Sequence, residues 1–91
     1  MKSNTKQFIS DIQQRNKNYI EEALKTIQHT EKEQTERIIQ KILNKMNIMM
    51  NLVTTYMEIE SGSTKELKKL QEEIIHAQEY IQKLRFEETQ R

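Results

Sequence analysis

The sequence predicts an all-α protein in which amphipathic helices pack against one another, and three observations support this. The 91 residues include one glycine and no proline, so the turn signals that short strands require are almost absent. Charged residues make up 32% and apolar residues 34%, a composition that fits either surface-rich helices or disorder. Apolar residues recur every three or four positions, a period that indicates helices and that a disordered chain would not show.

The break between helices is placed by Ser61-Gly62-Ser63, the one strong turn signal of the chain. Gly62 suits the left-handed position that follows the end of a helix. Ser63 and Glu66 have the spacing of a capping box, in which each side chain bonds the backbone amide of the other residue. The sequence therefore predicts a helix that ends near residue 60, a turn at 61–63 and a second helix over about residues 64–88.

The first helix begins with a weaker apolar pattern, which a polar block follows. Asn16 lies within the pattern and would fix the helix register if it is buried. Residues 28–37 contain no apolar side chain, glycine or proline, so we favour one continuous helix over about residues 5–60, roughly 85 Å long. The alternative is a bend near residues 28–36, where Thr30 and Glu33 match a second capping box. The apolar residues of the first pattern are Phe8, Ile9, Ile12, Tyr19, Ile20, Ala23, Leu24 and Ile27.

Residues 38–59 carry the widest apolar surface of the chain. One ladder follows the a/d spacing of a coiled coil: Ile39, Ile42, Met46, Met49, Val53 and Tyr56. Further apolar side chains flank it on both sides: Leu43, Met50 and Met57 on one, and Ile38, Leu52 and Ile59 on the other. An apolar arc on the order of 200° needs at least two neighbouring helices. The second helix supplies one neighbour, and we expect another molecule to supply the other.

The second helix has the seam of a coiled coil. Its apolar residues are spaced alternately by three and four positions: Leu67, Leu70, Ile74, Ala77, Ile81 and Leu84. A helix of about 25 residues covers only half of a 55-residue partner, which leaves the face from Phe8 to Ile27 in water. We therefore expect residues 1–91 to form a single helical domain, an antiparallel hairpin or coiled coil that assembles into an oligomeric bundle, with a dimer favoured.

The sequence does not predict an enzyme, and it indicates no catalytic, cofactor-binding or metal-binding residue. Adjacent carboxylates such as Glu72 and Glu73 point about 100° apart on a helix and do not face each other. The two histidines, His29 and His76, are far apart in sequence, and no cysteine accompanies them. One Glu-x-x-His pair, Glu73 with His76, does not build a di-metal centre, which needs two copies.

The net charge of +1 gives no overall attraction to nucleic acid or to anionic membranes. Two small basic clusters remain as candidates for phosphate contacts, and we expect both to be solvated: Lys41 and Lys45, and Lys65, Lys68 and Lys69. The first residues lack the apolar run of a signal peptide, and no stretch approaches the roughly 20 apolar residues of a membrane span. We expect a cytoplasmic protein.

These features favour a small helical protein–protein interaction module, an adaptor, inhibitor or assembly factor that self-associates or pairs with a helical partner. Two alternatives stay open: a chaperone for a helical client, such as a bacterial secretion or filament subunit, and a weakly basic dimeric nucleic-acid-binding protein. The methionines on residues 46–57 suit a surface that accepts varied partners, or fill gaps in an oligomer core. The predicted interface comprises Ile38, Ile39, Ile42, Leu43, Met46, Met49, Met50, Val53, Tyr56, Met57, Leu67, Leu70, Ile74, Ala77, Ile81 and Leu84.

Overall fold

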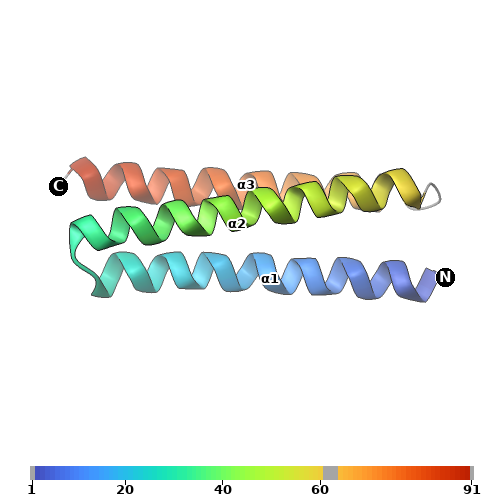
Figure 1. Ribbon diagram of the computed structural model, residues 1–91, viewed down its shortest axis with the longest axis horizontal. Coiled ribbons are helices and arrows are strands. Elements are labelled where there is room, and N and C mark those ends of the chain that lie inside the picture. The colour runs from blue at the N-terminus through green and yellow to red at the C-terminus, as the bar shows by residue number, and fades with distance from the viewer. Residues whose placement is uncertain (1, 61–63, 91) are drawn as a thin grey trace.

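A computed structural model of the chain confirms the all-α prediction. It describes residues 2–60 and 64–90, with side chains placed for residues 4–60 and 65–87. These residues form three helices, α1 (Lys2–His29), α2 (Lys32–Ile59) and α3 (Thr64–Gln90). The helices pack side by side in a rod with extents of 47 × 17 × 15 Å, and the chain reverses direction from each helix to the next (Figure 1). Since 28 residues rise about 42 Å, each helix runs almost the full length of the rod.

The continuous helix over residues 5–60 is wrong. α1 ends at His29 and α2 begins at Lys32, so the polar block contains a corner and not a helix interior. Helix propensity is a weak preference that tertiary contacts override. The bend lets α1 fold back along α2 and α3 and bury apolar surface that the straight helix would leave in water.

The prediction that Thr30 and Glu33 form a capping box at this corner is also wrong. Glu31, and not Thr30, is the N-cap of α2, and its side chain makes no capping hydrogen bond. The corner is held instead by Thr35, whose side chain is buried. Its Oγ1 donates to the carbonyl oxygens of Thr30 at 3.2 Å and Glu31 at 2.9 Å. The expected turn at 61–63 and the capping residue Ser63 lie outside the described residues.

The core consists of two apolar clusters in which all three helices take part. Ile12 of α1 packs with one cluster and Ala23 of α1 with the other, and the remaining buried members come from α2 and α3. The wide apolar arc of α2 thus finds its second neighbour in α1 of the same chain. The expectation that only another molecule could cover it is wrong, as is the expectation that the face from Phe8 to Ile27 lies in water.

Polar pairs along the edge of the rod fix the register of α2 against α3. Two hydrogen bonds and one ion pair join the helices, and a residue later in α3 pairs with a residue earlier in α2. The pairs are Gln71 to Thr54 (2.9 Å), Gln78 to Asn47 (2.7 Å) and Arg85 to Glu36 (2.6 Å). Residues near 54 therefore lie beside residues near 71, and the start of α2 lies beside the end of α3.

Candidate functional site

All sixteen predicted interface side chains are at least partly covered by the chain's own helices. They divide into eleven buried and five half-buried side chains. The buried members are Ile39, Ile42, Leu43, Met46, Met49, Val53, Leu67, Leu70, Ile74, Ala77 and Ile81, and the half-buried members are Ile38, Met50, Tyr56, Met57 and Leu84. We call the eleven buried side chains the α1-binding face, because they form clusters with Ile12 and Ala23 of α1. A partner can reach this face only where α1 has moved away.

The apolar arc of α2 is broader than its two neighbours cover. Leu52 and Ile59, which the sequence places on the flank of the ladder, are 45% and 74% exposed. Ile48 is 68% exposed and lies on the same side of α2, because residues 48, 52 and 59 fall within about 40° of one another on a helix. These three side chains form an exposed apolar stripe on the outside of the bundle.

The helix that covers the α1-binding face packs polar as well as apolar side chains on its buried side. The buried or half-buried residues of α1 include a seam with alternating spacings of four and three: Thr5, Ile9, Ile12, Asn16, Tyr19, Ala23 and Thr26. Thr5, Asn16 and Thr26 are buried, and among the described side chains of α1 the only large aliphatic one that is buried is Ile12. The corresponding seams of α2 and α3 are almost entirely apolar. Three of the seven seam residues of α1 are therefore polar, whereas the seams that it covers are apolar.

Asn16 is the least well satisfied of these polar groups. The residue is 8% exposed, and its Nδ2 donates to the backbone oxygen of Glu73 on α3 at 3.4 Å. Its Oδ1 is buried without a hydrogen-bond partner. Along α1, Asn16 lies between Ile12 of one cluster and Ala23 of the other, and Tyr19 packs against both clusters. A buried asparagine fixes helix register at a cost in stability. Asn16 is buried, which is the condition under which we expected it to fix the register.

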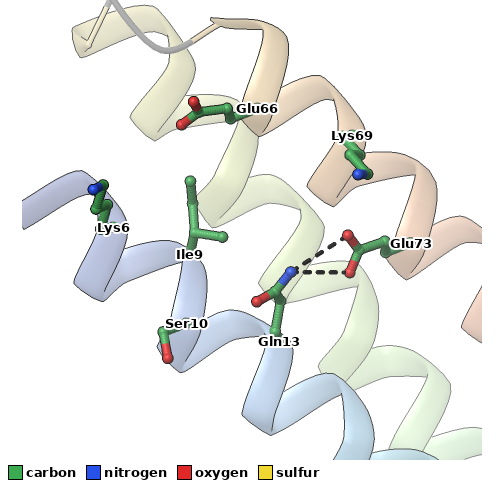
Figure 2. Close-up of a pocket in the computed structure, with 7 residues that line it drawn as sticks. All are labelled: Lys6, Ile9, Ser10, Gln13, Glu66, Lys69 and Glu73. Atoms are coloured by element: carbon green, nitrogen blue, oxygen red, sulfur yellow. Dashed lines mark hydrogen bonds between the residues drawn. The ribbon is translucent and has the colours of Figure 1, made fainter. Parts of the chain in front are cut away.

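A groove of about 360 Å³ opens along the line where α1 meets α3. Figure 2 shows Gln13 and Glu73 pointing toward each other across it, with Gln13 Nε2 donating to the two Glu73 carboxylate oxygens at 3.4 and 3.3 Å. Most of its lining is exposed, so water screens the charges; the lining residues are Lys6, Ile9, Ser10, Gln13, Glu66, Lys69 and Glu73. The groove is a gap in the packing of α1 against α3 and not an enclosed reaction site.

Three contacts at the N-terminal half of α1 oppose its release. The Phe8 ring stacks on the Tyr56 ring of α2, with centroids 4.0 Å apart and planes at 6°. The Tyr56 hydroxyl and Thr5 Oγ1 share a hydrogen bond of 3.2 Å. Ile12, 2% exposed, packs into the cluster of Met49 and Leu70. Further apolar side chains of α1 pack against the same two clusters: Ile9, Tyr19, Ile20, Ala23 and Ile27.

The two basic clusters do not meet. Lys41 and Lys45 are exposed on α2, and Lys65, Lys68 and Lys69 are exposed near the start of α3. Since residues near 54 face residues near 71, the α2 cluster lies beside the end of α3, on the order of 20 Å along the rod from the other. The fold leaves them as separate small patches.

The described residues contain no group of three His, Cys, Asp or Glu side chains placed to hold a metal ion. His29 and His76, the two histidines that the sequence analysis considered, are both exposed. Within residues 2–60 and 64–90, no helix combines the length and the apolar character that crossing a bilayer requires.

Sequence reasoning missed the threonines that shape the bundle. Thr5, Thr26 and Thr35 are buried, and each hydroxyl bonds a partner: Tyr56 for Thr5, and backbone carbonyls for the other two. Thr5 and Thr26 could have been found from their positions in the sequence. Thr5 lies seven residues before Ile12 and Thr26 lies seven residues after Tyr19, so all four lie on the same face of the helix.

Comparison of the chain with protein-family models, with curated proteins and with solved structures finds no match.

Proposed function

We propose that this chain is a helical protein–protein interaction module and that its α1-binding face holds a partner helix in the place that α1 occupies in the closed chain. The observation that carries the proposal is the mismatch between this face and α1. The face is lined by apolar side chains, whereas the α1 seam that covers it combines apolar residues with three buried polar ones, Thr5, Asn16 and Thr26. A helix with apolar residues at those places would bury more apolar surface and leave no orphaned amide oxygen.

The mismatch also indicates which kind of helix would bind this face. It is an amphipathic helix of about 25 residues, with large aliphatic side chains spaced alternately by three and four. Met46 and Met49 lie within the face, and Met50 and Met57 lie half-buried at its margin. Methionine side chains are flexible, so such a face can accept helices of differing shape. This adaptability suits an adaptor or an assembly factor, and equally a chaperone that holds a helical client.

Displacement of α1 makes partner affinity depend on how firmly α1 is attached. The apparent dissociation constant equals the intrinsic one divided by the fraction of chains with α1 released. A substitution that weakens the packing of α1 on its face should therefore tighten partner binding, and one that strengthens this packing should weaken partner binding. A docking site on the outside of the bundle would show neither effect.

The test uses a fluorescent peptide of residues 2–29 in which Thr5, Asn16 and Thr26 are replaced by leucine. The peptide is titrated with the full-length chain, and binding is followed by anisotropy. Ile12→Ala weakens α1 by about 2 kcal/mol or more and leaves the α1-binding face unchanged. We expect the Ile12→Ala chain to bind the peptide about 30-fold more tightly than the unmodified chain.

The matched controls separate this mechanism from binding at the exposed stripe. Asn16→Leu in the chain should weaken peptide binding, because it removes the unpartnered Oδ1 and so stabilises the packing of α1 on the face. Ile48→Asp alters the exposed stripe and should leave binding unchanged. Circular dichroism checks that each variant remains helical. If Ile48→Asp abolishes binding, or if Ile12→Ala fails to bind the peptide, the proposal is wrong.

A further inference from the structure

The corner between α1 and α2 is short, and one torsion angle of Glu31 separates that residue from helical geometry. It contains two residues, Thr30 and Glu31, and no glycine or proline occurs from residue 28 to residue 37. Glu31 has φ −61° and ψ 151°, so its φ is already that of an α-helix and only its ψ is extended. Nothing in the chemistry of Glu31 requires the bend, because a rotation about its ψ brings that residue to helical geometry.

The bent corner also lacks a side-chain cap. A helix begins with four amides that lack an intrahelical partner, and a capping side chain normally bonds one or two of them. The N-cap side chain Glu31 makes no such bond. In a continuous helix the amides of residues 32–34 would bond the carbonyls of residues 28–30. Straightening therefore replaces hydrogen bonds from these exposed amides to water with hydrogen bonds within the helix.

From this geometry we infer that two copies of the chain exchange α1. The corner straightens, α1 and α2 become one helix over residues 2–59, and α1 of each copy lies on the α1-binding face of the other. This inference rests on the proposed function, since α1 must leave its own face, and it names a second copy of this chain as a partner. Every contact of α1 in the closed chain re-forms between the two copies, so exchange loses none of them.

The arrangement of the exchanged pair follows from the closed chain. α1 runs opposite to α2 beside it, so a straightened helix lies opposite in direction to the α2 that its α1 covers (Figure 1). The two bundles then sit end to end and meet at their former corners. The residues near this junction are mainly polar and carry both signs of charge, with Glu31, Lys32 and Glu33 adjacent in sequence. Their mixed charges give no single-sign repulsion between the copies.

Thr35 holds the closed form against this exchange. Its Oγ1 donates to the carbonyl oxygen of Thr30, five residues earlier. In a straight helix that carbonyl would accept the amide of Gln34, so the Thr35–Thr30 bond belongs to the bend. The second bond of Thr35, to the carbonyl oxygen of Glu31 four residues earlier, is compatible with both forms.

Two substitutions at Glu31 separate the closed form from the exchanged form. Proline fixes φ near −65°, which Glu31 already has, so Glu31→Pro should be tolerated in the bent corner. In a straight helix the same proline removes the bond from residue 31 to residue 27 and clashes with that carbonyl. Glu31→Ala is the matched helix-favouring change at the same position. Thr35→Val keeps the side-chain shape and removes the hydroxyl that bonds Thr30.

Mass is measured by light scattering after size-exclusion chromatography, on chains refolded at micromolar and at millimolar concentration. We expect the unmodified chain to form dimers at the higher concentration. Glu31→Ala and Thr35→Val should raise the dimer fraction several-fold, and Glu31→Pro should reduce it at least tenfold. If Glu31→Pro dimerises as well as the unmodified chain, or if Glu31→Ala stays monomeric at millimolar concentration, exchange of α1 is refuted.

A distance measurement identifies the exchange directly. The chain has no cysteine, so dyes can be placed at Gln7→Cys and Glu58→Cys, two exposed sites at the same end of the closed bundle. The double-labelled chain is refolded with excess unlabelled chain. Exchange moves the two dyes on one chain to about 75 Å apart, so energy transfer should fall in the dimer fraction. Unchanged transfer in the dimer would show association without exchange and overturn the inference.

Failure of this inference is distinguishable from failure of the proposed function. Glu31→Pro blocks straightening but leaves α1 free to leave its face, so this variant should still bind the leucine-substituted peptide. Peptide binding without dimerisation would refute exchange and support the interaction module. Absence of peptide binding, in the unmodified chain and in Ile12→Ala alike, would refute the proposed function itself, and the exchange that rests on it.

Discussion

Replacing Asn16 with leucine tests whether α1 is poorly matched to the face that it covers. Both side chains branch at Cγ and have the same number of non-hydrogen atoms, so Asn16→Leu changes polarity at the same branching pattern, although leucine is the bulkier of the two. The substitution removes a buried Oδ1 without a partner, which costs about 1–3 kcal/mol. It gives up one hydrogen bond to Glu73, worth about 1 kcal/mol at most because 3.4 Å is long, and it adds buried apolar surface. We expect a net gain of about 2 kcal/mol in the free energy of unfolding.

The assay is chemical and thermal unfolding followed by circular dichroism. A gain of about 2 kcal/mol corresponds to a rise in Tm of about 10 °C for a chain of this size. Asn18→Leu is the matched control, because Asn18 is an exposed residue on the same helix. We expect that control to change stability by less than about 0.5 kcal/mol. If Asn16→Leu lowers Tm, or raises it no more than Asn18→Leu does, Asn16 is not a destabilising contact and the mismatch argument fails.

Three further substitutions probe how the helices are held, each measured by denaturant unfolding. Ile12→Ala should destabilise the bundle by about 2–5 kcal/mol, whereas Ile48→Ala at an exposed site should cost under about 0.5 kcal/mol, and equal losses would contradict the burial. Phe8→Ala should lose about 1 kcal/mol beyond its buried area because it removes the stack on Tyr56, and Phe8→Leu should recover the area but not the stack. Arg85→Gln removes a partly exposed ion pair with α2 and should cost at most about 1 kcal/mol; a loss undiminished in 1 M salt would speak against an electrostatic origin.

Local patterns predicted which faces of the helices are apolar, because a side chain's position around a helix depends only on its number in the sequence. The ladders from Ile39 to Val53 and from Leu67 to Ile81 are buried as their spacing indicated. The same reasoning overestimated the flank of α2, where Leu52 and Ile59 are exposed. Neighbouring helices, and not the apolar pattern, determine how much of an arc is covered.

The sequence by itself determined the helical class, the seams of α2 and α3 and the polar character of residues 28–37. Only the tertiary structure decided that the chain bends at Thr30 and Glu31, because straight and bent forms differ little in local propensity. The choice is made by apolar surface tens of residues away, which α1 covers once the chain folds back. Local preferences here are weak, so long-range burial selects the bend.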